Sequence, residues 1–385
     1  MTLVRSVEIL QDLVAFPTVS TDSNLAMISY LAERFELLGA RCEVLHDQSG
    51  QKANLFATLG PEGPGGILLS GHTDVVPVAD QDWNTDPFEL MSCDGLLYGR
   101  GTCDMKGFIA ATLAMAETLD VARLSRPLHF AFTHDEETGC LGAQGLVAFL
   151  ASRAIAPEIA IVGEPTQMRI IDGHKGCFEY TTRFVGLEGH GSAPDAGVNA
   201  AEYAARYVGK LLELREDLKR RAPSDSAFEP PWTTINVGSL AGGVAHNVIP
   251  GKAEVSWEMR PVQIRDADFV KAALSDFVRD HLLPEMKFVH SDASVTTETI
   301  GEVVGLEPMS QNAARDLVAE LTGANGTDLV SFGTEAGLLQ SLGTNVVVCG
   351  PGSIEQAHKP DEYLSTSQLD LCCGMLDRLG RRLTS

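Results

Sequence analysis

The chain has 385 residues, of which 44% are hydrophobic; this length is long for a single compact domain and favours two domains. A formal net charge of −23 and a pI near 4.7 argue against nucleic acid and against anionic membrane surfaces as partners. No stretch approaches ~18 consecutive apolar residues, so no membrane-spanning helix is expected.

The first part of the chain alternates between helical and strand-like patterns. Residues 3–16 and 24–38 have the apolar spacing of amphipathic helices, and strands then alternate with helices to about residue 175. Four apolar runs are typical of buried strands, at residues 67–70, 130–133, 159–162 and 346–349. This alternation predicts a doubly wound α/β sheet.

The middle of the chain follows a different pattern. It predicts a strand near 178–185, a helix over 199–218, strands near 233–240 and 253–260, and a helix over 266–281. This β-α-β-β-α order resembles a split βαβ sandwich. We therefore expect residues 177–287 to form a domain inserted into a catalytic domain made of residues 1–176 and 288–385.

Metal-binding side chains follow most of the predicted buried strands. In open α/β sheets, ligands collect in the crevice beyond the carboxyl ends of the strands, and the spacing places these side chains there. Taken singly, each is more often a solvated turn residue, but the combination indicates a two-metal hydrolase. The candidates are His72 and Asp74, Asp104, Glu136 and Glu137, Glu164, and His358.

These residue types suit a pair of zinc-like ions. Such ions take imidazole and carboxylate ligands and can share one carboxylate and one water molecule. Glu136, beside Glu137, can stay free of metal and take a proton from that water. Asp74, two residues after His72, is placed to accept the second imidazole N–H and fix its tautomer.

Four stretches of the chain resemble motifs of the M20 metallopeptidase and deacylase family, and a fifth contains His358. They are Ser70–Pro77 (SGHTDVVP), Gly99–Gly107 (GRGTCDMKG), Thr133–Gly139 (THDEETG) and Gly163–Thr166 (GEPT). The resemblance implies a zinc-aminopeptidase-like catalytic domain with an inserted ferredoxin-like α+β lid, through which two subunits form a homodimer. It also implies two Zn²⁺ ions per subunit, with Co²⁺ able to substitute.

The resemblance further assigns individual roles. It implies that His72, Asp104 and Glu164 hold one zinc, that Asp104, Glu137 and His358 hold the other, and that Glu136 is the general base and acid. Residues 102–104, 333–337 and 350–363 resemble most closely the members that convert N2-acetyl-L-ornithine to L-ornithine and acetate. We therefore expect a small N-acyl amino acid as the substrate.

Four further residues are secondary candidates. His190 matches the lid histidine that stabilises the tetrahedral oxyanion, although a turn histidine flanked by glycines is the alternative. Arg260 and Asn247 match positions that bind the substrate carboxylate, against a surface ion pair as the alternative for Arg260. Glu335 could neutralise a side-chain amine such as that of ornithine, or could stabilise a helix dipole.

Several other functions remain as alternatives. Within the same class, the chain could deacylate N-succinyl-diaminopimelate or cleave dipeptides. A non-catalytic pseudoenzyme would be expected to lack the base or a ligand, whereas Glu136 and all five ligand positions are present. A nicotinamide oxidoreductase is disfavoured because no dinucleotide fingerprint follows an early strand.

Cysteine usage favours a reducing compartment. The eight cysteines form no CxxC pair and show no disulfide-like spacing. Residues 2–20 also lack the uninterrupted apolar core of a signal peptide. We therefore expect a cytoplasmic protein.

Overall fold

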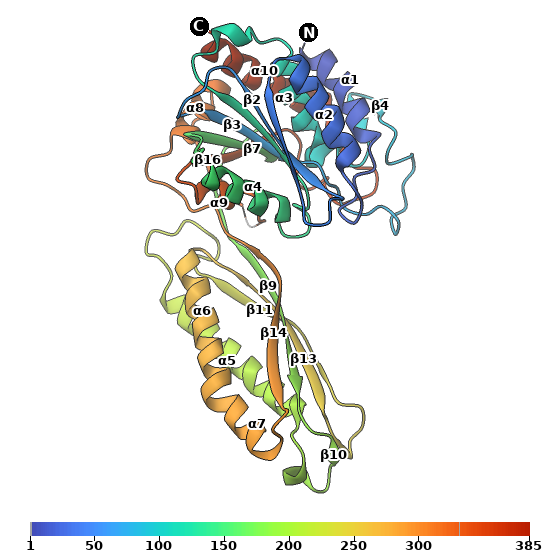
Figure 1. Cartoon of the computed structure of the whole chain (residues 1–385), viewed down its shortest axis with the longest axis vertical. Helices are drawn as coiled ribbons and strands as arrows, with labels where there is room; N and C mark the ends of the chain where they lie inside the picture. The colour runs from blue at the N-terminus through green and yellow to red at the C-terminus, as the bar shows by residue number, and fades with distance from the viewer. Residues whose placement is uncertain (1, 331) are drawn as a thin grey trace. The chain divides into compact units, whose positions relative to one another are not determined.

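The computed structural model describes residues 2–330 and 332–385 and divides the chain into two units (Figure 1). Unit 1 comprises Met1–Gly173, Pro308–Leu329 and Thr334–Ser385. Unit 2 comprises His174–Glu307 and Val330–Gly333. The fold class is mixed α/β, as the sequence predicts.

Unit 1 is built around an eight-stranded sheet with the order β1-β2-β6-β3-β7-β16-β8-β15. The central strands β6, β3, β7 and β16 run parallel, while β1, β2 and β8 pair antiparallel to their neighbours. Every residue of β3, β6 and β7 is buried, because helices cover both faces of the parallel core. The strands are β1 (Arg41–His46), β2 (Ala53–Leu59), β3 (Ile67–His72), β6 (Leu128–Thr133), β7 (Ile159–Pro165), β8 (Ile171–His174), β15 (Asp328–Val330) and β16 (Asn345–Gly350).

Aromatic side chains fix helices on both faces of this sheet. Phe35 of α2 packs against Phe130 and Phe132, with ring centroids 4.6 and 5.8 Å away. Phe56 points to the opposite face and meets Phe149 of α4 at 6.4 Å. Helix α3 is apolar and buried on all sides. The helices of unit 1 are α1 (Thr2–Val14), α2 (Leu25–Leu37), α3 (Gly107–Ala116), α4 (Leu141–Ser152), α8 (Ala313–Thr322), α9 (Ala336–Gln340) and α10 (Thr366–Leu383).

A small three-stranded sheet lies next to the segment that contains Asp104. Its order is β17-β5-β4, so residues near 360 are brought beside residues near 100. The chain then passes through the short helix η1 (Thr102–Lys106) into α3, and η2 (Val121–Arg123) follows later. The strands are β4 (Met91–Cys93), β5 (Leu96–Tyr98) and β17 (Tyr363–Ser365).

Unit 2 has a four-stranded antiparallel sheet with the order β11-β13-β9-β14 and helices on one face. Alternate residues of β9 and β13, such as Phe178, Phe184 and Val255, form the core with α5 and α6. The other face carries exposed ion pairs, such as Arg183 with Glu254. This inside–outside alternation is typical of a sheet that is covered on one side.

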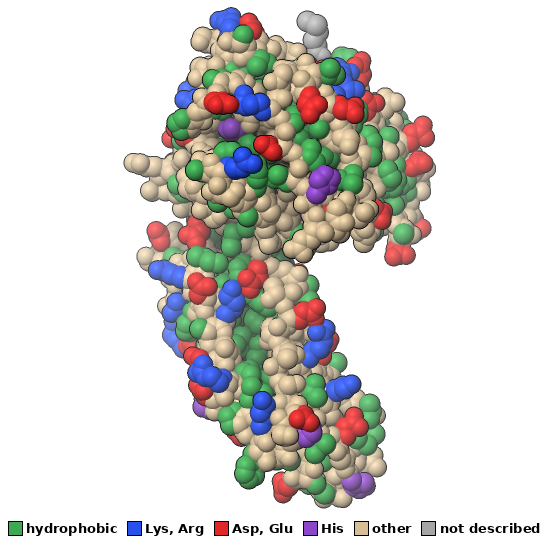
Figure 2. All heavy atoms as spheres, viewed as in Figure 1, with side chains coloured by type: hydrophobic (Ala, Val, Ile, Leu, Met, Phe, Trp, Pro, Cys, Tyr) green, Lys and Arg blue, Asp and Glu red, His purple; other side chains and the backbone are tan. Residues whose placement is uncertain are grey.

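The elements of unit 2 follow the order β-α-β-β-α-β. Its strands are β9 (Cys177–Val185), β10 (Gly189–His190), β11 (Thr234–Gly242), β12 (Val248–Ile249), β13 (Lys252–Arg260) and β14 (Ser294–Val303). Its helices are η3 (Pro194–Ala196), α5 (Ala200–Arg220), α6 (Ile264–Phe277), η4 (Val278–Leu282) and α7 (Leu283–Val289). Figure 2 shows side chains of both charges scattered over each unit, as expected for surfaces in contact with water.

The boundary of unit 2 differs from the expected one at its carboxyl end. The sequence pattern predicts that the inserted region ends at residue 287, but β14 pairs with β9 and unit 2 extends to Glu307. The middle of β14 is exposed and rich in Thr and Glu, so it lacks the apolar run that indicates a buried strand. Among the described residues, no helix combines the length and the apolar composition that crossing a membrane requires.

The buried His129 of unit 1 should make the stability of the fold fall at acidic pH. The His129 ring stacks on Phe56, and its Nδ1 lies 2.8 Å from Thr58 Oγ1. Burial, with a contribution from Arg41, lowers the pKa of His129 to about 4. The unfolded chain takes up this proton near pH 6.5, so the stabilisation is complete above that pH and is lost as the pH falls towards 4.

We therefore expect His129→Gln to flatten the pH dependence of stability. Between pH 6.5 and 4, the wild type should lose about 3 kcal/mol more unfolding free energy than this variant. Urea unfolding at several pH values measures the difference, with the exposed His46→Gln as the control. Parallel pH profiles for wild type and His129→Gln would contradict the assignment.

Candidate metal centre

The candidate ligands meet at the carboxyl-terminal edge of the parallel strands. His72 is the last residue of β3, Glu164 lies near the end of β7, and Glu137 lies in the turn after β6. Asp104 lies in η1, and His358 lies in the turn between β16 and β17. These five side chains all belong to unit 1, although they come from segments far apart in the sequence.

Asp104 lies between two groups of ligand atoms. Its Oδ1 is 2.9 Å from His72 Nε2, and its Oδ2 is 3.4 Å from His358 Nε2. His72 Nε2 is also 3.8 Å from Glu164 Oε1, and His358 Nε2 is 3.0 Å from Glu137 Oε2. The two oxygens of Asp104 therefore lie near two different histidines, an arrangement that suits a shared metal ligand.

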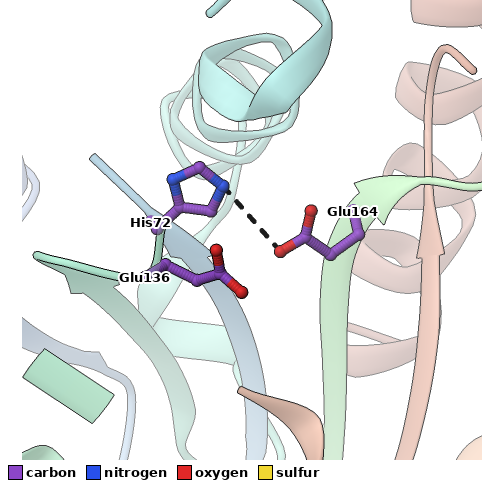
Figure 3. Close-up of side chains that lie close together, drawn as sticks. All are labelled: His72, Glu136 and Glu164. Carbon is purple, nitrogen blue, oxygen red and sulfur yellow. Dashed lines mark ion pairs between the residues drawn. The ribbon is translucent and has the colours of Figure 1, made fainter. Parts of the chain in front are cut away.

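Glu136 borders the same space. In Figure 3 its carboxylate and that of Glu164 point towards the region beside the His72 ring. Ligand atoms of these three residues lie within 4.8 Å of one another, as do those of His72, Asp104 and Glu137. Glu136 is therefore close enough to act on a molecule held among the ligands.

The electrostatics of this cluster call for cations. Burial raises the pKa of Glu136 and Glu164 well above the usual range, and the carboxylate of Asp104 raises both further. Glu164 Oε1 is buried without a hydrogen-bond partner among the described residues. Because buried charges are costly unless they are paired or bind metal, this set of nitrogen and oxygen donors fits divalent ions of the zinc type.

Asp74 has different contacts from those expected. His72 Nδ1 lies 2.8 Å from the backbone oxygen of Asp74, whereas the Asp74 carboxylate is 3.6 Å away, beyond hydrogen-bond distance. The carboxylate instead accepts the Ser20 hydroxyl at 2.7 Å and the backbone N–H of Glu136 at 3.1 Å. The backbone of Asp74 thus orients the imidazole, and its side chain holds the turn that carries Glu136.

Glu335, the candidate partner of a substrate amine, lies in the interior of unit 1. It is 1% exposed and precedes α9. Its Oε1 accepts the Ser70 hydroxyl at 2.6 Å, and its Oε2 accepts the Thr133 hydroxyl at 2.8 Å. Both oxygens are therefore bonded to hydroxyl groups near the ends of β3 and β6, and contact between Glu335 and a substrate amine stays a prediction.

The other three candidates lie in unit 2. His190 is exposed and lies in β10, which pairs with β12. Asn247 immediately precedes β12, and its backbone oxygen accepts the N–H of Gly191 at 2.7 Å. Ser192 N–H donates to His190 Nδ1 at 3.2 Å, so a neutral ring carries its proton on Nε2. Arg260, at the end of β13, donates to Glu258 at 2.8 Å.

Comparison with known proteins places the chain in a family. Peptidase family M20/M25/M40 matches residues 68–382, which is most of the chain. The chain belongs to this family. It is therefore a metal-dependent hydrolase, as the resemblance of its motifs implies.

Individual relatives support the same fold over nearly the full length. The chain is 38% identical to an acetylornithine deacetylase of Shigella sonnei over 94% of this chain and 93% of that protein. An M20 metallo-carboxypeptidase of Sulfolobus solfataricus has a TM-score of 0.74, covering 98% of this chain and 99% of its own, at 16% identity. Aminopeptidase PepT of Bacillus cereus has a TM-score of 0.73 at 18% identity, covering 100% and 99%.

Two features of the site were missed by sequence reasoning. Glu362 accepts backbone N–H groups of the segment that contains Asp104, and Gln81 donates to the backbone oxygen of His358. Glu362 lies only four residues after His358, and this closeness to a candidate metal ligand could have marked Glu362 as a residue of the site. Gln81, in an irregular loop, gave no signal.

Proposed function

We propose that this protein hydrolyses N2-acetyl-L-ornithine to L-ornithine and acetate, a step of arginine biosynthesis. The observation that supports this substrate is the 38% identity to an acetylornithine deacetylase, which extends over nearly the whole of both chains. The peptidases of similar structure are at most 20% identical, so they support the fold and not a peptide substrate.

We propose that two Zn²⁺ ions, replaceable by Co²⁺, are held by His72, Asp104 and Glu164 and by Asp104, Glu137 and His358. When bound, such ions polarise the acyl oxygen of the substrate and lower the pKa of the attacking water. Glu136 takes the proton that this water loses and delivers it to the departing α-amine, so one side chain acts first as base and then as acid.

Residues of unit 2 complete the proposal. Arg260 and Asn247 would bind the α-carboxylate of the substrate, since a guanidinium forms paired hydrogen bonds with a carboxylate. His190 would donate its Nε2 proton to the oxyanion. We also propose that unit 2 is the lid and dimerisation domain, and that the protein acts as a cytoplasmic homodimer in which His190 serves its own or the partner's site.

A substrate panel tests the proposed function. Protein reconstituted with zinc or cobalt is assayed with acetylornithine, acetylcitrulline, succinyl-diaminopimelate and a dipeptide. We expect acetylornithine to give the highest kcat/KM. A preference for the succinyl substrate or for the dipeptide would assign one of the other activities of the family, and no hydrolysis by the metal-loaded protein would exclude the proposal.

The role of His190 is tested by a matched pair of variants. His190→Ala should lower kcat about 100-fold without changing metal content, because one oxyanion donor is worth roughly 3 kcal/mol. Ser192→Ala is the control, since the backbone N–H of residue 192 still fixes the His190 tautomer. Steady-state kinetics and metal analysis are the measurements. An unchanged kcat in His190→Ala would remove the oxyanion role.

A further inference from the structure

A buried carboxylate cradles the backbone around Asp104. Glu362 Oε1 accepts the N–H groups of Cys103 and Asp104 at 2.8 and 3.0 Å. Its Oε2 accepts the N–H of Gly101 at 3.0 Å and Arg100 Nη1 at 2.8 Å. The Glu362 side chain is 1% exposed, so these four hydrogen bonds are made without competition from water.

Arg100 also connects the residues around Asp104 with His358. Arg100 donates through Nη1 to the backbone oxygen of Lys359 at 3.2 Å and through Nη2 to Gln81 Oε1. Gln81 in turn donates through Nε2 to the backbone oxygen of His358 at 2.8 Å. A continuous chain of hydrogen bonds therefore connects the backbone of Asp104 with the backbone of His358.

This connection joins two segments that lie far apart in the sequence. Residues 100–104 precede α3, whereas residues 358–362 precede β17. The backbone is irregular at Asp104 in the first segment and at His358 in the second. His358 has a positive φ of 64°, which a residue other than glycine adopts only when its surroundings hold it there. Bonds to the flanking backbone supply that constraint.

We propose that Glu362, Arg100 and Gln81 are positioning residues that hold Asp104 and His358 at the separation at which they share one cation. The proposal rests on the proposed function, because it takes Asp104 and His358 as ligands of the same ion. Groups that fix metal ligands without touching the metal commonly change affinity 10–100-fold when they are removed. These three residues bond to backbone atoms of the two ligand-bearing segments and not to the ligating side chains.

Gln81→Ala tests the proposal without disturbing the core. Gln81 is only half-buried and lies in a loop, so the variant should fold with the melting temperature of the metal-free wild type. It removes the hydrogen bond to His358 and the one that Gln81 accepts from Arg100, and it leaves Glu362 in contact with the Asp104 backbone. Titration calorimetry with Co²⁺ should then show two binding events, of which one is weakened at least about tenfold and the other is unchanged.

Two further variants sharpen the measurement. Glu362→Gln disturbs the backbone of Asp104, which both ions share, so both binding events should weaken. Asp82→Asn alters an exposed residue of the same loop and should bind Co²⁺ like the wild type. In Gln81→Ala, saturating Co²⁺ should restore kcat almost fully, since the catalytic groups themselves are unaltered.

The outcomes separate this inference from the proposed function. If the wild type binds two cations and Gln81→Ala and Glu362→Gln bind them equally tightly, the positioning role is wrong while the two-metal site stands. If the wild type itself binds fewer than two cations, the proposed function fails and this inference fails with it. Weakening of one event in Gln81→Ala and of both events in Glu362→Gln supports the proposal.

Discussion

Glu136→Gln should abolish turnover while both cations remain bound. The variant keeps the size of the side chain but cannot accept a proton, and removing a general base costs about 10²–10⁴-fold in rate. Here the same group is proposed to serve two proton transfers, so we expect the loss to lie at the upper end of that range. Steady-state kinetics with acetylornithine and metal analysis of the purified variant give the two measurements.

Metal content is the informative part of this experiment. Glu136 lies with His72 and Glu164 in a group whose ligand atoms are within 4.8 Å of one another, so a ligand role is geometrically open to it. A Glu136→Gln variant that loses a cation would reassign the residue as a ligand. Thr138→Ala, an exposed change in the same turn, is the control and should retain wild-type activity.

Asp104→Asn should have an equally large effect for a different reason. Asp104 has one oxygen near His72 and the other near His358, so neutralising it should weaken both proposed ion sites at once. Losing one partner of a buried charge pair costs about 3–5 kcal/mol, which corresponds to roughly 150- to 5,000-fold in affinity. Activity at limiting zinc should fall at least as far.

Thermal melting provides an independent measurement of this effect. A cation that binds only the folded state raises the melting temperature, so added zinc should stabilise the wild type but not Asp104→Asn. Asp120→Asn, which changes an exposed acid of unit 1, is the control and should respond like the wild type. Equal stabilisation of Asp104→Asn by zinc would show that Asp104 is not a shared ligand.

The sequence predicts the central sheet well because its signals are local. The four apolar runs correspond to β3, β6, β7 and β16, and burial on both faces makes such runs continuous. Strand β14 was missed because it lies at an edge of the sheet and exposes Thr and Glu. Nothing in its own residues indicates that it pairs with β9, which lies more than a hundred residues earlier.

The metal site could be predicted as a set of residues but not as a set of contacts. Strand ends specify which side chains meet, and that is how His72 and Glu164 were found. The actual hydrogen bonds of Asp74 and Glu335 depend on the positions of Ser20, Ser70 and Thr133, which only the tertiary structure supplies. Sequence patterns therefore identify these carboxylates as candidates but do not give their hydrogen-bond partners.

The central claim is that five side chains of unit 1 hold a pair of cations that share Asp104. Anomalous diffraction from zinc-soaked crystals tests it most directly. We expect two peaks roughly 3.5–4 Å apart, one on each side of the Asp104 carboxylate. The absence of peaks at Asp104, or a single zinc bound without it, would contradict the account.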